Sequence, residues 1–222
     1  MERRGVIFDM DGVLVDSYHA HFESWRRLGE EKLGRAVAER EFAAFFGRRN
    51  REIIRLLCGN HVTDEQADEW GRWKEVVYRD ILLRNFPAMD GVGDLLDGLK
   101  RAGFVLAIGS SGPPGNIEAV LRGLGRENFF EATVSGAEVP VGKPEPDVFL
   151  VAARKLGLPP SRCAVVEDSL AGLEAARRAS AVPIAITGTA TREQLNGQAA
   201  LVVDSLRQLS PEKIAALIDA QK

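Results

Sequence analysis

The sequence predicts an α/β protein with a doubly wound, mainly parallel sheet and an inserted block of helices. Short aliphatic runs alternate with helical patterns over residues 90–222, and continuous apolar runs are typical of strands covered on both faces of a sheet. Residues 17–86 contain helical patterns and no strand-like run. A helical block therefore interrupts the predicted sheet after its first strand.

The predicted strands share an aliphatic composition, and most are followed by Gly, Ser, Asp or Glu. They lie at residues 5–8, 104–108, 132–134, 163–166, 183–186 and 201–203. Aliphatic residues at helical spacing predict intervening helices near residues 92–101, 117–124 and 148–156, each followed by a glycine that can end it. Ser210-Pro211 provides an N-cap and a first-turn proline for a last helix.

The helical block also carries its own start and stop signals. A first helix is predicted by the apolar face that Tyr18, Phe22, Trp25 and Leu28 share, and a second by Ile53, Ile54 and Leu57. A longer third helix is predicted to begin at the capping box Thr63-Asp64-Glu65-Gln66 and to end before Pro87. We expect residues 17–87 to form one domain and residues 1–16 with 88–222 to form the other.

Composition excludes several classes of protein. The chain has 222 residues and a net charge of −3, so it lacks the basic excess of nucleic-acid-binding proteins. It contains neither an apolar stretch of about 18 residues nor a signal-peptide pattern, which predicts a cytoplasmic protein without a membrane partner. Its two cysteines form no zinc-binding spacing, and Cys163 is expected to be a core thiol. We expect a monomer or a weak homodimer.

Polar residues follow the ends of several predicted strands. In an open α/β sheet, ligands bind at the carboxyl ends of the strands, so these residues are expected to meet in one crevice. They are Asp9, Asp11, Ser110, Ser111, Lys143, Glu167 and Asp168. Singly, each has a simpler interpretation: a turn aspartate, a loop serine, a surface lysine, or a helix N-cap at Asp168-Ser169. Their joint position at strand ends favours a site.

The residue types in this set favour phosphate chemistry. Crowded carboxylates repel one another and need a cation, and a set of oxygen donors suits Mg²⁺. Lys143 and a serine hydroxyl suit an anion beside that metal. An aspartate can attack phosphorus once the phosphate oxygens are neutralised, and a second aspartate two residues later can move protons.

The motifs resemble those of the haloacid dehalogenase-like (HAD) superfamily. Asp9-Met10-Asp11-Gly12 resembles its first motif, and Ser110, Gly142-Lys143-Pro144 and Glu167-Asp168 follow in the family's order, within a match over residues 5–189. The helical insert resembles the cap domain of the branch that contains β-phosphoglucomutase and many small phosphatases.

The resemblance implies a role for each acidic residue. Asp9 is the expected nucleophile, and Asp11 the expected general acid/base, which also gives its backbone carbonyl to Mg²⁺. Asp9 and Asp168 are expected metal ligands, with Glu167 binding directly or through water. Dehalogenating members lack the second acid, so the presence of Asp11 favours phosphate as the substrate group.

The remaining expected contacts hold the phosphate and the rest of the substrate. The resemblance implies that Ser110, Ser111 and Lys143 bind the phosphate. It also implies that the cap closes to exclude water and select the substrate. The cap candidates are His21, Arg49, Asn50 and Lys74. Each also has a simpler interpretation, since His21 could be an unreactive histidine and Lys74 could face solvent.

Two departures separate this chain from β-phosphoglucomutase. The mutase has a lysine shortly after the second motif, whereas this chain has Gly112-Pro113-Pro114-Gly115, and the mutase has a cap arginine where this chain has Asn50. We therefore predict a Mg²⁺-dependent phosphatase that hydrolyses a small phosphomonoester, such as a sugar phosphate, through an aspartyl-phosphate. A β-phosphoglucomutase-like mutase is the alternative, and a non-enzymatic phospho-acceptor module is the alternative from another class.

Overall fold

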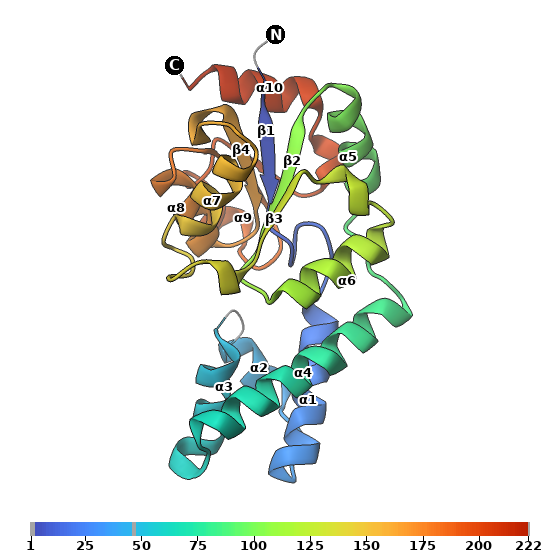
Figure 1. Ribbon diagram of the computed structural model, residues 1–222, viewed down its shortest axis with the longest axis vertical. Coiled ribbons are helices and arrows are strands. Elements are labelled where there is room, and N and C mark those ends of the chain that lie inside the picture. Colours follow the sequence, from blue (N-terminus) through green and yellow to red (C-terminus); the bar gives the residue numbers. More distant parts are fainter. Residues whose placement is uncertain (1–2, 46–47, 222) are drawn as a thin grey trace. The chain divides into compact units, whose positions relative to one another are not determined.

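The computed structural model describes residues 3–45 and 48–221, and the chain divides into two compact units (Figure 1). One unit comprises Met1–Asp16 and Pro87–Lys222, and the other comprises Ser17–Phe86. We call them the α/β unit and the helical unit, and each is described by itself.

The α/β unit contains one parallel sheet, which confirms the predicted fold class. In the described part of the chain the sheet has six strands in the order β3-β2-β1-β4-β5-β6, and every neighbouring pair is parallel. The strands are β1 (Gly5–Phe8), β2 (Val105–Gly109), β3 (Ala132–Val134), β4 (Cys163–Glu167), β5 (Val182–Ile186) and β6 (Leu201–Val203). β1 therefore lies in the middle of the sheet, between β2 and β4.

Helices lie between the strands of this sheet and after the last one (Figure 1). They are α5 (Val92–Arg101), α6 (Pro114–Leu124), α7 (Asp147–Lys155), α8 (Leu170–Arg178), α9 (Arg192–Leu195) and α10 (Pro211–Asp219), with short 3₁₀ turns at Glu127–Phe129, Gly136–Glu138, Pro160–Arg162 and Leu206–Gln208. Ser210 caps α10 as expected, accepting from the Lys213 amide. Helix α9 was not predicted, because its four residues are too few to show a periodic apolar face.

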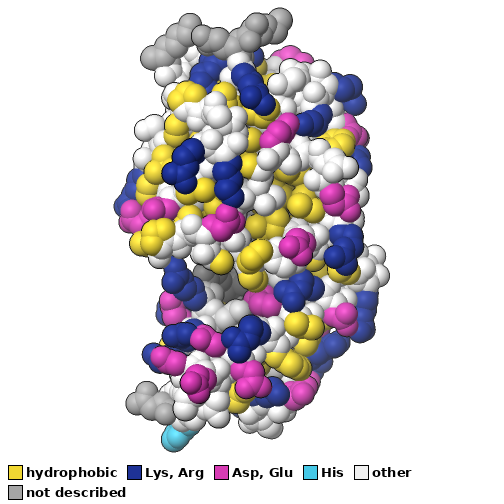
Figure 2. All heavy atoms as spheres, in the orientation of Figure 1, with side chains coloured by type: hydrophobic (Ala, Val, Ile, Leu, Met, Phe, Trp, Pro, Cys, Tyr) yellow, Lys and Arg dark blue, Asp and Glu magenta, His cyan; other side chains and the backbone are white. Residues whose placement is uncertain are grey.

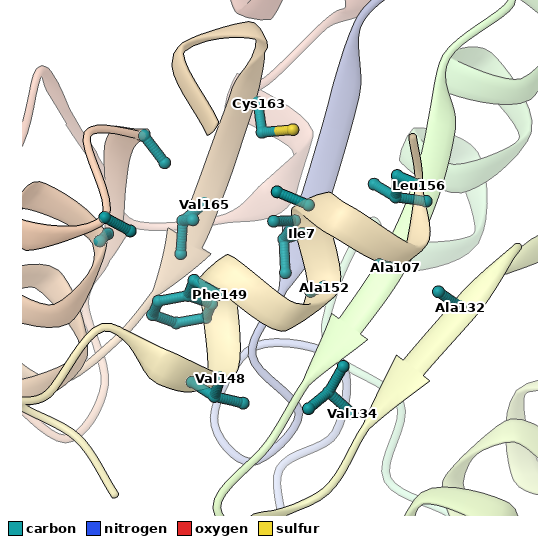
Figure 3. Packing of buried hydrophobic residues seen from close by; sticks show 14 of the residues in the cluster. Ile7, Ala107, Ala132, Val134, Val148, Phe149, Ala152, Leu156, Cys163 and Val165 are labelled. Atoms are coloured by element: carbon teal, nitrogen blue, oxygen red, sulfur yellow. The ribbon is translucent and has the colours of Figure 1, made fainter. Parts of the chain in front are cut away.

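The core between α7 and the sheet fixes where the strands end. Figure 3 shows Phe149 and Ala152 of α7 packed beside Ile7 of β1 and Val165 of β4, and all four side chains are fully buried. Cys163 is part of this core, as expected, and burial raises the pKa of its thiol to about 12. Because a one-residue slip would turn these side chains away from the core, the register at the ends of β1 and β4 is well defined.

The helical unit consists of α1 (Tyr18–Leu33), α2 (Glu39–Phe45), α3 (Asn50–Cys58), a 3₁₀ turn (Gly59–His61) and α4 (Asp64–Arg84). The capping box is confirmed, since Thr63 Oγ1 accepts from the Gln66 amide and Gln66 Oε1 accepts from the Thr63 amide. Helix α2 was not predicted, although Phe42 is buried against the ring of Phe22. Its seven residues are again too few for a clear period.

The charged side chains and the hydropathy of the helices complete the description of the fold. Figure 2 shows acidic and basic side chains interspersed over the face in view, as a net charge of −3 allows. Among the described residues, no helix combines the length and the apolar character that crossing a membrane requires.

Candidate active site

The site begins where β1 and β4 end side by side. Phe8 pairs with Val166 in the parallel register, and the Asp9 amide donates to the Val166 carbonyl at 2.9 Å. Asp9 therefore lies next to Glu167, the last residue of β4, although more than 150 residues separate them in the chain. Both side chains are buried. The sheet topology alone brings these two acids together, as expected for a site at the carboxyl edge.

Asp9, Glu167 and Asp168 form the acidic centre. In the described chain, one carboxylate oxygen from each lies within 4.8 Å of the others. Burial raises the pKa of Asp9 well above its usual value; Lys143 opposes this rise, and neighbouring acids including Glu167 add to it. Burial, followed by the charge of Glu167, raises the pKa of Asp168 to about 7. The centre thus holds more negative charge than its surroundings neutralise, which fits a divalent cation with oxygen ligands.

Lys143 is a buried member of the site and not a surface lysine. Its Nζ donates to Asp9 Oδ1 at 2.5 Å and to Glu167 Oε1 at 2.6 Å. The same ammonium lies 4.9 Å from the centre of the Phe149 ring, which belongs to the core beneath the site. Burial alone would lower the pKa of Lys143, but the two carboxylates raise it overall, so the ammonium stays charged.

Glu167 is held in place by the beginning of α8. Its Oε2 accepts from the Asp168 amide, the Ser169 amide and the Ser169 hydroxyl, each at 2.8–2.9 Å. Ser169 is also the N-cap of α8, accepting from the Gly172 amide at 3.0 Å, so the N-cap interpretation holds at Ser169. With Oε1 bound to Lys143, both oxygens of Glu167 are engaged. The carboxylate therefore fixes Lys143 relative to the acidic centre.

Two glycines make room for these carboxylates. A Cβ at Gly172 would lie 1.7 Å from Glu167 Oε1, and a Cβ at Gly12 would lie 2.1 Å from Asp168 Oδ2. Gly12 also has a φ of +77°, which disfavours any side chain. Asp168 Oδ2 additionally accepts from the Thr189 amide at 3.2 Å. Sequence reasoning missed Gly172 as a site residue, and its only signal was a glycine in the first turn after Glu167-Asp168-Ser169.

Asp11 and the two serines lie around this centre. Asp11 follows in the loop after β1, is partly exposed, and contributes to the raised pKa of Asp9. Ser110 follows β2, which pairs with β1, and its buried hydroxyl accepts from the Gly112 amide at 3.0 Å. Ser111 is exposed. Because Asp9 and Ser110 both follow neighbouring strands, the sheet brings the serine to the same edge as the acids.

The helical unit gathers three of the four cap candidates into one cluster. Lys74 Nζ lies 2.9 Å from His21 Nδ1 and 3.1 Å from Glu75 Oε1, and Asn50 Nδ2 donates to the same Glu75 oxygen at 2.7 Å. Lys74 is 1% exposed, so the solvent-facing interpretation is wrong. Arg49 is exposed at the N-cap position of α3. Glu75 was not among the predicted residues, because a glutamate next to a lysine on a helix usually faces solvent.

Comparisons with known proteins find sequences that are similar over most of the chain. A model of the haloacid dehalogenase-like hydrolase family matches residues 4–180. The chain is 31% identical to a phosphorylated carbohydrates phosphatase of Thermotoga maritima, covering 94% of this chain and 95% of that one. It is 30% identical to a β-phosphoglucomutase of Bacillus subtilis, covering 82% and 83%.

The comparison with solved structures also finds a haloacid dehalogenase-like hydrolase. The crystal structure of a HAD hydrolase of family IA, variant 3, from Entamoeba histolytica matches with a TM-score of 0.89 and 28% identity, covering 97% of this chain and 99% of that chain. The similarity in sequence and the similarity in fold thus extend over most of the chain and indicate the same family. The chain belongs to the haloacid dehalogenase-like hydrolase family.

Proposed function

We propose that this chain is a Mg²⁺-dependent phosphatase that hydrolyses small phosphomonoesters, such as sugar phosphates, through an aspartyl-phosphate on Asp9. The supporting observation is the buried contact of Lys143 with Asp9 and Glu167 inside a cluster of carboxylates. This arrangement combines a nucleophile, a cation for phosphate oxygens and a set of oxygen ligands. The names of relatives such as the phosphorylated carbohydrates phosphatase support the substrate class.

The donor set fits Mg²⁺. Asp9 and Asp168 each offer a carboxylate oxygen, and the pKa values of both are raised by burial and by neighbouring acids, as expected for carboxylates that a cation would stabilise. We propose these two as direct ligands, with the backbone carbonyl of Asp11 as a third. Both Glu167 oxygens already accept hydrogen bonds, so we propose that Glu167 acts through water. When bound, Mg²⁺ would neutralise phosphate charge for attack by an anion.

The reaction then proceeds in two displacements. The Asp9 carboxylate attacks phosphorus, a P–O bond to Asp9 forms, and the bond to the leaving oxygen breaks. Asp11 gives its proton to that oxygen, so the alcohol leaves neutral. In the second step Asp11 takes a proton from water, which attacks phosphorus and breaks the bond to Asp9. Inorganic phosphate is released, and both aspartates return to their starting states.

Lys143 and Ser110 position the phosphate in this scheme. Lys143 is charged, buried and in contact with Asp9, so its ammonium can neutralise an oxygen of a phosphate that approaches the nucleophile. The hydroxyl of Ser110 and the backbone and side chain of Ser111 supply further hydrogen bonds. We also propose that the helical unit, Ser17–Phe86, acts as a cap that selects the substrate.

A mutase remains the second candidate, because a β-phosphoglucomutase is among the relatives. A mutase must bind a bisphosphate in two orientations, and the segment Gly112–Gly115 lacks the lysine that would assist this. Incubation with β-glucose 1-phosphate and a trace of the 1,6-bisphosphate separates the candidates. We expect free phosphate to accumulate. Fast formation of glucose 6-phosphate without free phosphate would favour the mutase.

The test of the proposed function is a screen of phosphorylated metabolites with Mg²⁺ and with a chelator. We expect release of phosphate from one or more monophosphates, its loss on chelation, and its loss in Asp9→Asn. Activity that survives chelation, or full activity in Asp9→Asn, would contradict the mechanism.

A further inference from the structure

The loop after β2, residues 110–112, is held at both ends by the chain that follows β3. We call these three residues the serine loop. Strands β2 and β3 lie side by side (Figure 1), and the Ser110 amide continues their pairing by donating to the Val134 carbonyl at 3.0 Å. Beyond the last residue of β3, the Gly136 amide donates to the Gly112 carbonyl at 3.1 Å. The two bonds fix where the serine loop begins and where it ends.

Gly136 also lies directly against the middle of the serine loop. A Cβ at position 136 would lie 2.2 Å from the carbonyl oxygen of Ser111 and 2.9 Å from its carbonyl carbon. The φ of Gly136 is not in the positive range, so its backbone conformation is open to residues with a side chain. Glycine is therefore needed here because the Ser111 carbonyl approaches so closely, and not because of the local backbone.

One peptide plane connects this contact with the hydroxyl of Ser110. In a trans peptide the carbonyl oxygen and the amide hydrogen point in opposite directions. The Ser111 carbonyl faces Gly136, and the amide of the next residue, Gly112, donates to Ser110 Oγ at 3.0 Å. Rotation of this plane would withdraw the amide from Ser110 Oγ. The hydroxyl accepts this bond and keeps its own hydrogen for donation to another oxygen.

The turn that contains Gly136 is itself held in place by Glu138. Its Oε1 accepts from the Ser135 amide at 2.9 Å and from the buried Ser135 hydroxyl at 3.1 Å. Its Oε2 accepts from Lys155 Nζ at 2.6 Å. The bonds from Lys155 and Ser135 lower the pKa of Glu138, so the carboxylate stays charged and continues to accept near neutral pH. Gly136 therefore sits on a fixed turn, against which the Ser111 carbonyl rests.

We propose that Gly136 is a positioning residue that fixes the peptide plane between Ser111 and Gly112 and thereby aims the Ser110 hydroxyl at the phosphate. This inference rests on the proposed phosphatase function and adds a residue outside the motifs on which phosphate binding depends. An alanine at position 136 would push the Ser111 carbonyl away by roughly 1 Å before ordinary van der Waals distance is reached. A displacement of this size strongly weakens a contact that depends on alignment.

The experiment measures how tightly inorganic phosphate binds to the full-length protein with Mg²⁺. Phosphate is the product of the proposed reaction, so calorimetric titration with it probes the serine loop without a leaving group. We expect Gly136→Ala to weaken phosphate binding by about tenfold and to raise KM for a hydrolysed monophosphate by a similar factor. The matched control is Gly93→Ala in α5, where a Cβ would lie 3.8 Å from the Arg126 guanidinium. The control should leave phosphate affinity unchanged.

A double-mutant cycle separates a positioning role from a general loosening of the fold. Ser110→Ala removes the hydroxyl that Gly136 is proposed to aim, and it should itself weaken phosphate binding. In the Ser110→Ala background we expect Gly136→Ala to weaken binding by less than about threefold, because its target is already gone. The same factor in both backgrounds would overturn the inference.

Glu138→Ala decides the question if thermal unfolding shows that Gly136→Ala does not fold. The variant removes the acceptor of the Ser135 amide and hydroxyl and so loosens the turn beneath the serine loop. We then expect phosphate binding to weaken by about threefold in proteins that retain Ser110 and to change little in the Ser110→Ala background. Unchanged affinity in Glu138→Ala would in that case overturn the inference.

The outcomes separate this inference from the proposed function. If the wild-type protein hydrolyses phosphomonoesters but neither Gly136→Ala nor Ser110→Ala changes its affinity for phosphate, the inference fails and the phosphatase function stands. A wild-type protein that neither binds phosphate nor hydrolyses any phosphomonoester would overturn the proposed function, and the inference with it.

Discussion

Each of the two units buries a lysine against a carboxylate, and in the α/β unit further acids crowd around the pair. In the α/β unit, Lys143 contacts Asp9 and Glu167, and Asp168 adds further negative charge beside them. In the helical unit, Lys74 contacts the Glu75 carboxylate and the His21 ring. Crowded carboxylates beside a buried lysine favour a cation and so phosphate chemistry. This difference in surroundings is the reason that we propose the reaction at Lys143 and not at Lys74.

The largest effect is expected for Asp9→Asn. The amide cannot form the acyl-phosphate, so kcat should fall by at least about a thousandfold. The fold should remain, because the change removes one charge from a crowded acidic centre. Phosphate release and circular dichroism measure the two properties. Asp80→Asn, at an exposed aspartate on α4, is the control and should keep full activity. Comparable activity in the two variants would refute the role of Asp9.

Lys143→Met should have the next largest effect. It leaves the buried carboxylates of Asp9 and Glu167 without their partner, and breaking a buried pair typically costs about 3–5 kcal/mol of unfolding free energy. Activity should fall with it. Denaturant unfolding and phosphate release check both. Lys155→Met, which removes an exposed lysine paired with Glu138, should change stability by less than about 1 kcal/mol. Equal losses in the two variants would contradict the burial argument.

The pH dependence of stability should depend on Mg²⁺. The pKa of Asp168 is about 7 in the folded protein and near 3.8 when unperturbed, so the metal-free folded state holds an extra proton between these values. Protonation of Asp168 therefore stabilises the folded state relative to the unfolded state. This stabilisation is fully present below pH 3.8 and is lost as the pH rises through 7. Mg²⁺ needs the deprotonated form, so the rise in Tm that it causes should grow from about pH 5 to about pH 8. Melting curves with Mg²⁺ and with a chelator measure this, and a Mg²⁺ effect that shrinks with pH would contradict it.

Gly172→Ala tests the fixed position of Glu167. The new Cβ would collide with the carboxylate, so it should displace Lys143 and lower activity by about tenfold or more. The control is Gly98→Ala in α5, where a Cβ would lie 3.5 Å from the Pro211 ring. There, alanine should stabilise the helix by about 0.5–1 kcal/mol and leave activity unchanged. If Gly172→Ala behaved like Gly98→Ala, the description of Glu167 would be wrong.

The smallest effect is expected in the helical unit for Thr63→Ala. The variant removes the side chain that caps α4, which should cost about 1 kcal/mol of unfolding free energy. Because Thr63 is remote in the chain from the catalytic motifs, kcat should stay within about twofold. Thermal unfolding and kinetics check the two values. A large loss of kcat would contradict a purely structural role for Thr63.

The sequence allowed prediction of those parts of the site that depend on topology alone. Asp9, Lys143, Glu167 and Asp168 each follow or flank a strand of a parallel sheet, and the carboxyl ends of such strands meet at one edge. The approach of Gly172 to Glu167 depends on the tertiary fit of α8, which residue spacing does not contain.

The helical unit was harder to predict for the same reason. The capping box at Thr63 is a local pattern and was found. The pairing of Asn50 with Glu75 joins two helices, and no period or motif indicates which side chains meet between them. Helix α2 lacked a signal because it is short. Local signals thus predicted where most helices lie, but not which polar side chains they bury together.

The central claim is that Asp9 carries the phosphoryl group during turnover. The most direct measurement mixes enzyme with substrate, quenches in acid within the first turnover, and reduces the product with borohydride. Reduction of an aspartyl-phosphate yields homoserine, which peptide mass spectrometry locates. We predict homoserine at position 9 and unchanged aspartate at position 11. Homoserine at Asp11, or at neither position while phosphate is released, would contradict the account.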